Sequence, residues 1–548
     1  MTFASRCSEC GFFLGTSSDD SQQISESFAV RVDTTPEYYK LLSSNDPPYE
    51  SCDVELVDSV VSETEKCLER IDDRIARLRS RLAQLEHQRL SLSKHLARNK
   101  SILSPLRRLP DEILVEIFSW TLPSIVTMRR RGSFDVTQPP WILGHISSRW
   151  RAVALASPSL WSLVAVNYTG TVDDRLPMPR AMLETQLERA LTLKIHFYAS
   201  EKAAISPQQW MFEFLAAQST RWEELSISLT ADLLPLLNRL RGQLPVLSRL
   251  WLQWDSARSQ PKAAAQSELI DTIDCFETAP ALVDVGIYNE YAFVPVRLPI
   301  RQLVRYQLDG PLAVHRRLLE QAARTLVEVH IDLCFHPPFW VDSDHITIPS
   351  LRRLYIRDSI VLDYLTLPAL EEVALCIWDL RTASYVANIQ SLVSRSACPL
   401  RRLCVKGLLT SQSTLDLLHA LPSVAELAFI AHSHYSKNGA EELIEALSDV
   451  SAAPHLSGVF LGCENKCHID YALYAEMLRA RWEADHCALH RAALLIDSNW
   501  DSDSLSGLTD ETRFDLDVLR GEGLDLVLCE GVEATEVIGG WTFNSVWN

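Results

Sequence analysis

The sequence lacks the marks of a membrane, secreted or phosphate-binding protein. No apolar run approaches the roughly 18 residues that a membrane-spanning helix needs, and Met1 to Asp20 lack the basic-then-apolar order of a signal peptide. Only 18 glycines occur among 548 residues, and none lies in a GxGxxG or Walker-type pattern. HExxH and GxSxG are also absent, so no familiar catalytic centre is visible. We expect a soluble protein of the cytoplasm or nucleus that is not an enzyme.

The net charge of −19 makes general nucleic-acid binding unfavourable, because the phosphates would repel the chain as a whole. The negative net charge slightly favours a basic protein as a binding partner. Residues 1–55 are acidic and rich in Ser, Asp, Thr and Pro, so we expect a disordered tail there. Residues 501–548 are expected to form a second acidic segment. Adjacent acids such as Glu223 and Glu224 are expected to form a solvated face and not an acid–base pair.

The thirteen cysteines are irregularly spaced, which is typical of buried thiols and not of a disulfide framework. Cys7 and Cys10 form a CxxC pair with no second pair nearby. They are either free thiols in a tail or half of a zinc site shared between two chains. A later group has enough ligand types for a metal, but its spacing matches no common site: Cys463, Cys467, His468, His486, Cys487 and His490. We therefore expect no cofactor.

A long helix is predicted over residues 56–103, because neither proline nor glycine occurs between Val54 and Leu103. Apolar residues alternate steps of three and four along it, interrupted at Thr64 and Arg89, as in a coiled-coil seam. These seam residues are Val61, Leu68, Ile71, Ile75, Leu78, Leu82, Leu85, Leu92 and Leu96. The alternative is one helix packed on its own protein. The pattern does not decide whether the seam closes on a second copy or on the same chain.

The stretch SPLRRLPDEILVEIFSW, residues 104–120, predicts a new short helix. Pro105 ends the long helix and Pro110 suits a first helical turn. Leu109, Ile113, Leu114, Ile117 and Phe118 form an apolar stripe, with Trp120 near its end. A second helix is expected from Trp141 to Ala156, followed by a strand at LWSLVAV. Helices this short cannot make a sufficient core alone, so they need another surface.

From about residue 190 the pattern L-x-x-L-x-L recurs ten times, at starts 19 to 35 residues apart. Its first and last occurrences begin at Trp222 and Leu456. The segments between them include helical patterns such as LIDTIDCF, TLDLLHAL and AEELIEAL. The pattern predicts stacked strand-plus-helix units over residues 185–500, in an irregular leucine-rich-repeat horseshoe. The alternative is a mixed α/β domain whose buried strands happen to be rich in leucine.

These residues resemble a known family. LSPLRRLPDEILVEIF and PPWILGHISSRWRAVALASPSLWS, within residues 103–162, look like an F-box. RALTLKI and STRWEELSISL resemble the opening repeats of F-box proteins with degenerate leucine-rich repeats, an expanded set in mushroom-forming (basidiomycete) fungi. The resemblance covers roughly residues 65–500. The segment 121–140, with its basic run MRRR, is longer than the corresponding segment in compact members of the family. The resemblance therefore does not define the first inter-helix loop.

The resemblance implies an α/β chain with a coiled-coil helix, an all-α F-box over 104–165 and a leucine-rich-repeat solenoid. It also implies a receptor role, in which the F-box docks on a Skp-family adaptor of a cullin–RING ubiquitin ligase and the repeats hold a protein substrate. The adaptor-binding residues would be Leu109, Pro110, Ile113, Leu114, Ile117, Ile146, Trp150, Leu155, Pro158 and Trp161. Three alternatives remain: packing of these residues on the repeat domain alone, a scaffold outside a ligase, or a metal protein or enzyme built on the cysteines.

Overall fold

The computed structural model divides the chain into two compact units, Met1–Pro110 and Asp111–Asn548. Besides positions 40, 43, 125 and 128, it describes residues 51–123, 134–169, 180–256, 273–289, 293–334, 345–377, 382–407, 411–432, 437–464, 469–484, 488–497 and 508–543.

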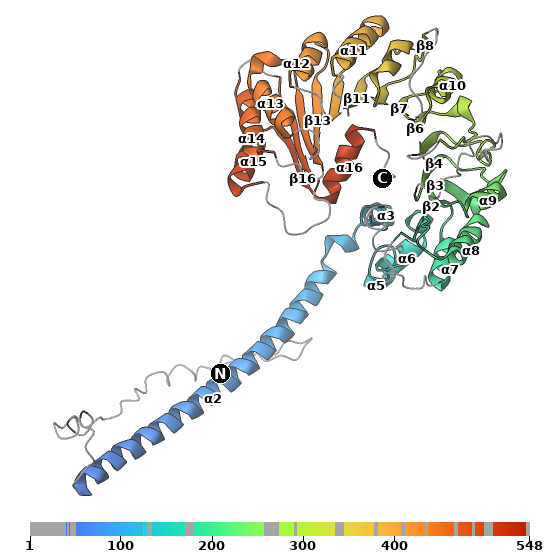
Figure 1. Ribbon diagram of the computed structural model, residues 1–548. Coiled ribbons are helices and arrows are strands. Elements are labelled where there is room, and N and C mark those ends of the chain that lie inside the picture. Colours follow the sequence, from blue (N-terminus) through green and yellow to red (C-terminus); the bar gives the residue numbers. More distant parts are fainter. Residues whose placement is uncertain are drawn as a thin grey trace. The chain divides into compact units, whose positions relative to one another are not determined.

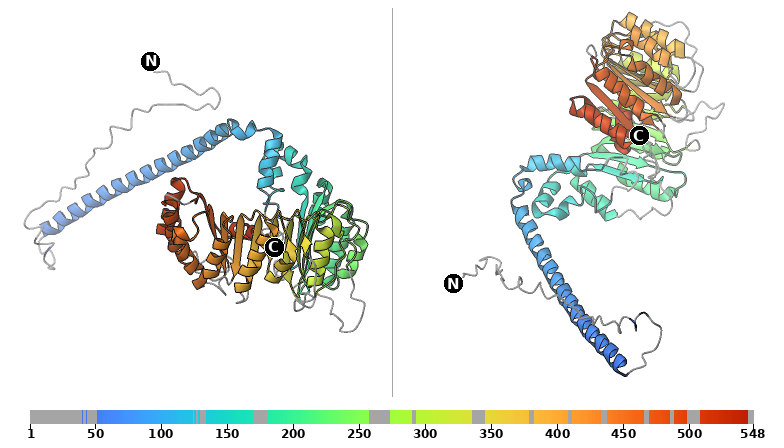
Figure 2. Two further views of the ribbon diagram at one scale, coloured as in Figure 1. Left: turned by 90° about the horizontal axis from the view of Figure 1, so that it is seen from above. Right: turned by 90° about the vertical axis from the view of Figure 1, so that its left-hand side faces the viewer.

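The first unit is dominated by one helix, α2, which spans Ser51–Ile102. Its 52 residues make it about 78 Å long at a rise of about 1.5 Å per residue, and Figure 2 shows it as continuous in both views. The predicted long helix is therefore confirmed. Seam residues such as Leu78 and Leu82 are 62% and 57% exposed. Of the helices in the described residues, none is both long and apolar enough to cross a bilayer.

The second unit begins with short helices. They are α3 (Asp111–Trp120), α5 (Leu143–Ile146), α6 (Ser148–Leu155) and the 3-10 turn η2 (Pro158–Trp161). The single helix expected from Trp141 to Ala156 is wrong, because the chain is extended at Ser147 (φ −156°, ψ 163°). The Ser147 hydroxyl accepts a hydrogen bond from the Trp150 amide at 3.1 Å. Ser147 thus caps α6 and starts a separate helix.

The rest of the unit is built on one parallel sheet of 14 strands, which confirms the α/β class. The strands follow one another in chain order, an arrangement compatible with a solenoid. They are β1 (Leu163–Asn167), β2 (Leu193–Tyr198), β3 (Trp222–Leu229), β4 (Arg249–Trp254), β5 (Asp284–Tyr288), β6 (Arg305–Gly310), β7 (Glu328–Leu333), β9 (Arg353–Ile356), β11 (Glu372–Ile377), β12 (Arg402–Gly407), β13 (Glu426–His432), β14 (Gly458–Glu464), β15 (Arg491–Ile496) and β16 (Asp525–Glu530). Two further strands, β8 (Ile346–Thr347) and β10 (Leu365–Thr366), pair separately.

Helices cover one side of this sheet, which we call the outer face (Figure 1). They are α7 (Arg180–Arg189), α8 (Ile205–Ala216), α9 (Leu234–Leu237), α10 (Leu312–Ala322), α11 (Thr382–Ser396), α12 (Ser411–Ala420), α13 (Lys437–Ser448), α14 (Tyr471–Trp482) and α15 (Asp510–Gly521). The last helix, α16 (Val532–Trp541), lies on the opposite, inner face. All ten L-x-x-L-x-L segments coincide with strands, from β3 to β14, and the last two apolar positions of each are at most 5% exposed.

The sheet extends beyond residues 185–500 at both ends, because β1 precedes that range and β16 follows it. The helix expected at LIDTIDCF is wrong for its described residues, 273–276. Ile273 forms a bridge with Val296, and its carbonyl accepts from the Arg297 amide at 2.7 Å. This extended pairing uses the backbone groups that a helix would need.

The first inner-face position of successive strands carries alternating charge. In strand register from β2 to β16, with β9 beside β7, these positions are Lys194, Glu224, Arg249, Asp284, Arg305, Glu328, Arg353, Glu372, Arg402, Glu426, Gly458, Arg491 and Asp525. Gly458 has no side chain, and Arg491 reaches across it to Glu426 at 2.8 Å. This row of charges, which we call the ladder, favours one strand register. A shift of a strand by one residue would turn each of its charged side chains to the other face of the sheet.

The ladder corrects the expectation for Glu224. This residue is only 4% exposed, and its carboxylate contacts His196 at 2.9 Å and Arg249 at 3.2 Å. Burial by itself would raise the pKa of Glu224, but the hydrogen bond from His196 and the charges of His196 and Arg249 lower it overall. Glu224 is a paired structural anion and not part of a solvated face.

Removing one carboxylate from the ladder should destabilise the sheet. Glu328 is 8% exposed and contacts Arg305 at 2.6 Å and Arg353 at 3.0 Å. We expect Glu328→Ala to lower the free energy of unfolding by about 2–3 kcal/mol, because two cations lose a partly buried partner. The matched change Glu371→Ala removes an exposed carboxylate 3.8 Å from Arg352 and should cost less than about 0.5 kcal/mol. Urea denaturation followed by circular dichroism measures both, and equal losses would contradict a structural role for the ladder.

Candidate functional site

Helix α3 has two apolar faces. Leu114 and Phe118 are fully buried and form the inward face. Ile113, Ile117 and Trp120 follow a spacing of four and three on another face, where Ile113 is 47% and Trp120 is 82% exposed. Leu114 and Phe118 thus serve the core of their own unit, whereas Ile113 and Trp120 are exposed to solvent.

The inward face of α3 packs on α6. The rings of Phe118 and Trp150 lie 4.8 Å apart. At the start of α3, Arg149 contacts the Asp111 carboxylate at 2.6 Å. These contacts fix the orientation of α3, so its outward residues are presented on an ordered helix.

The short helices are attached to the start of the sheet through Trp161. Its indole nitrogen donates to the Ala154 carbonyl at 2.8 Å, and its ring lies edge-on to Trp141 with centroids 5.0 Å apart. The guanidinium of Arg189, at the end of α7, lies 4.4 Å from the Trp161 ring centre. From α7 the Gln186 amide donates to the Leu163 carbonyl of β1 at 2.6 Å. Residues 141–169 and 180–189 therefore pack as one block.

The ten residues expected to bind a partner divide by exposure. Exposed residues are Pro110, Ile113, Ile146, Leu155 and Pro158; half-buried ones are Leu109, Ile117 and Trp150; buried ones are Leu114 and Trp161. Leu109 and Pro110 belong to the first unit. Leu114 and Trp161 are 0% and 2% exposed, so they hold the helices together and offer no surface for direct contact.

Sequence reasoning missed Trp120 as a surface anchor. The residue stands seven positions after Ile113, two helical turns along the same face. Its indole nitrogen donates to the Glu116 carboxylate at 3.0 Å, which holds the ring in place on the surface. The spacing alone would have placed it with Ile113 and Ile117.

The inner face of the sheet is partly covered by α16. Ile538 and Trp541 join an apolar cluster with inner-face side chains from β9 to β15, among them Ile430 and Phe460. Gly462 on β14 allows this approach, because a Cβ there would come within 3.1 Å of both α16 side chains. Just after α16, the Phe543 carbonyl accepts a hydrogen bond from Arg305 on β6 at 2.6 Å.

A cavity of about 330 Å³ opens on the inner face of β4 to β9. Its walls combine aromatic and hydrogen-bonding side chains: Trp251, Gln253, Ile287, Tyr288, Gln307, Leu308, Asp309, His330, Asp332 and Tyr355. Gly286 makes room for the Trp251 indole in this wall, since a Cβ at that position would collide with the indole ring. Burial lowers the pKa of His330 well below its usual value, and the charge of Arg305 adds to this effect. His330 is therefore a neutral imidazole near neutral pH.

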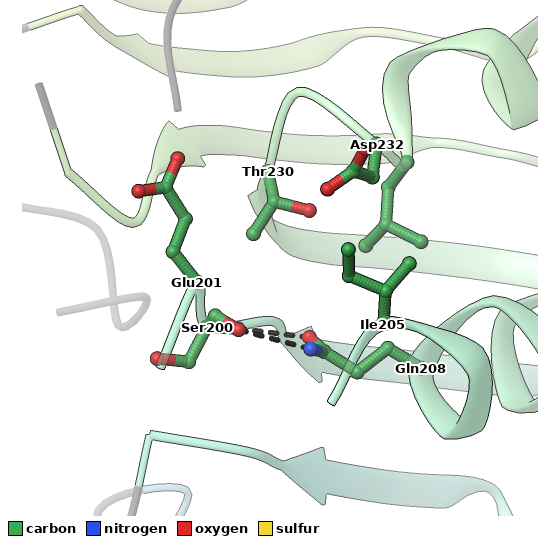
Figure 3. Close-up of a pocket in the computed structure, with 7 residues that line it drawn as sticks. Ser200, Glu201, Ile205, Gln208, Thr230 and Asp232 are labelled. Carbon is green, nitrogen blue, oxygen red and sulfur yellow. Dashed lines mark hydrogen bonds between the residues drawn. The ribbon is translucent and has the colours of Figure 1, made fainter. Parts of the chain in front are cut away.

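A second cavity, of about 240 Å³, lies beside the loops that follow β2 and β3. Figure 3 shows the Gln208 side chain pointing toward Ser200, with Thr230 and Asp232 on the other side. The Gln208 amide accepts from the Ser200 backbone N–H and donates to the Ser200 carbonyl, both at 2.9 Å. Gln208 thus ties a loop to α8, which is a structural role.

Within the described residues no group of three or more His, Cys, Asp or Glu side chains could hold a metal ion. Cys463 is 2% exposed on β14. Cys7, Cys10, Cys467, His468, His486 and Cys487 lie outside the described residues, as does most of the acidic tail. No model of a known protein family matches the chain, and no curated protein matches it.

Proposed function

We propose that this chain is the substrate-recognition subunit of an SCF-type cullin–RING ubiquitin ligase. Residues 104–165 would form an F-box that docks on a Skp-family adaptor, and the 14-stranded sheet would form a leucine-rich-repeat domain that holds a protein substrate. The resemblance of residues 103–162 suggests this role. The observation that best supports the proposal is the outward apolar face of α3, where Ile113 and Trp120 are exposed to solvent.

An exposed apolar face on an ordered helix suits a protein partner better than solvent. Burying apolar surface stabilises a complex by about 25 cal/mol per Å² before ordering costs. Tryptophan is a frequent anchor of protein interfaces, and apolar residues spaced along one helix face are the anchors when a helix lies in a groove of its partner. The ion pair of Arg149 with Asp111 and the packing of Phe118 on Trp150 hold α3 in position before the partner arrives.

The remaining steps belong to partners under this proposal. The adaptor would link the chain to a cullin, and the ubiquitin-transferring chemistry would reside in the other subunits. The role assigned to this chain is to bring a substrate near them, in the cytoplasm, the nucleus or both.

Affinity purification tests the proposal. A tagged full-length chain should carry a Skp-family adaptor and a cullin with it when recovered from cells of its source. Recovery of neither protein would contradict the ligase role and would favour a scaffold that acts outside a ligase.

The exposed seam of α2 favours a second property, self-association. Apolar residues repeated every three and four positions need a partner helix, and seam residues of α2 such as Leu78, Leu82 and Leu85 are 48% to 62% exposed. We propose that α2 pairs with α2 of a second copy. This property is compatible with either the ligase or the scaffold role.

Charges placed in the seam should separate the copies. We expect the full chain to sediment as a dimer and the double variant Leu78→Glu, Leu85→Glu to sediment as a monomer, because each dimer would bury four carboxylates. Ser80→Glu with His87→Glu is the matched control, since both positions lie away from the seam. A residue 60–100 fragment should likewise self-associate. A monomeric mass for both the fragment and the unaltered chain at high concentration would rule out the pairing.

A further inference from the structure

Two polar residues interrupt the apolar seam of α2, and they distinguish the two ways in which a second copy can pair with it. Thr64 and Arg89 occupy seam positions among the apolar residues. Arg89 is exposed, and the seam residues Leu85 and Leu92 on either side of it are 48% and 50% exposed. What Thr64 and Arg89 face in the pair therefore depends on the orientation of the second copy.

A parallel pair in register is unfavourable at Arg89. Each seam residue then faces the same residue of the second copy, so Arg89 faces Arg89 and Thr64 faces Thr64. The two guanidiniums repel each other at a position that the pair partly shields from water, and like charges cost more there than in bulk solvent.

An antiparallel pair removes this conflict. Thr64 of one copy can face Arg89 of the second copy, so the two polar residues share a layer and no arginine faces another in the seam. Glu65, the next residue after Thr64, supplies a carboxylate beside that arginine. The other layers are then apolar: Val57, one heptad before Thr64, with Leu96; Val61 with Leu92; Leu68 with Leu85; Ile71 with Leu82; and Ile75 with Leu78.

The distribution of charge along α2 favours the same orientation. Residues 54–73 contain seven acids against two bases, a net charge of −5. Residues 80–99 contain four bases against one acid, a net charge of +3 with the histidines neutral. The antiparallel layers bring these two blocks side by side at both ends of the pair, whereas a parallel pair lays each block beside its own copy. The three arginines between the blocks lie near the middle in both orientations and do not discriminate.

We propose that α2 pairs with α2 of a second copy in antiparallel orientation, with Thr64 of each copy facing Arg89 of the other. The two chains then leave the pair at opposite ends, because Ile102 of one copy lies level with Ser51 of the other. At a rise of about 1.5 Å per residue, the two Ile102 residues are about 75 Å apart. The inference rests on the self-association proposed above and is independent of the ligase role.

Distances between spin labels in the full-length dimer test the orientation. An unnatural residue with an azide group carries the label, so the thirteen native cysteines stay unlabelled. Ser91 and Ser80 are exposed and lie off the seam. In the antiparallel pair the two labels at Ser91 should be about 45 Å apart, and the two labels at Ser80 less than about 30 Å apart. A parallel pair would bring the labels within about 30 Å at both positions.

A charge at position 64 gives a second test. Thr64→Glu places a carboxylate opposite Arg89 of the second copy in the antiparallel pair, but opposite an identical carboxylate in the parallel pair. The matched control is Thr64→Gln, which introduces a side chain of the same size without the charge. We expect the dissociation constant of the dimer to be at least about threefold lower for Thr64→Glu than for Thr64→Gln. Sedimentation equilibrium of both variants at low salt measures this difference.

The outcomes separate the orientation from the self-association on which it rests. A dimer whose Ser91 labels lie within about 30 Å of each other overturns the antiparallel orientation and leaves the self-association intact. A dimer of Thr64→Glu that is no tighter than that of Thr64→Gln also overturns it, because position 64 would then not face Arg89. An unaltered chain that stays monomeric contradicts the self-association and the orientation together.

Discussion

Replacing Leu109, Pro110 and Ile113 together by alanine should abolish binding to a Skp-family adaptor while the sheet stays folded. Ile113 is 47% exposed and Pro110 is also exposed, so neither supports the core of its own unit. Truncating several interface anchors at once removes several kcal/mol of binding free energy, so the affinity should fall at least about 100-fold. Calorimetric titration with purified adaptor measures this loss.

The matched control replaces three exposed apolar residues elsewhere by alanine. Leu191, Val246 and Val304 are 73%, 41% and 39% exposed and lie beside strands of the sheet. This variant should bind the adaptor like the unaltered chain. Undiminished affinity after the Leu109, Pro110 and Ile113 changes would contradict a role for these three residues in adaptor binding.

Placing a charge at Ile538 should release α16 from the inner face. Ile538 is 1% exposed and contacts the cluster that includes Phe460. We expect Ile538→Asp to lower the free energy of unfolding by about 3–5 kcal/mol, because a carboxylate finds no partner in this apolar cluster. Denaturant unfolding gives the loss, and increased binding of a hydrophobic dye would report the uncovered side chains.

Val537 provides a matched control for this change. It is the preceding residue on α16 and is 44% exposed. Val537→Asp adds the same carboxylate to the same helix but leaves the packed side untouched, so it should cost less than about 1 kcal/mol. Equal losses for the two variants would mean that α16 does not depend on its contact with the sheet.

The strands were predictable because their signal is local. In each L-x-x-L-x-L segment the last two apolar positions are two residues apart, the period of a strand, and in the structure they turn toward the helices of the outer face, as Leu250 and Leu252 do on β4. The long helix was equally clear, since nothing interrupts it between Val54 and Leu103. The spacing of apolar residues and the positions of proline and glycine were sufficient to predict both the strands and the long helix.

Other features depend on distant residues. The alternating charges become a ladder only when strands as far apart as Lys194 and Asp525 are in register, and one strand alone shows only a charge at its start. Helix α16 was expected only as part of an acidic segment, because Gly539 and Gly540 weaken its helical pattern. The apolar residues of α16 pack against inner-face side chains of distant strands, and this contact is visible only in the folded structure. The break at Ser147 followed from a local cap that the apolar spacing concealed.

Direct binding of the purified full-length chain to a purified Skp-family adaptor tests the central proposal. We expect a 1:1 complex with a dissociation constant below about 1 µM, and we expect the Leu109, Pro110 and Ile113 variant to remain unbound under the same conditions. The absence of any complex with the unaltered, folded chain at about 100 µM adaptor would contradict the proposal that residues 104–165 form an F-box.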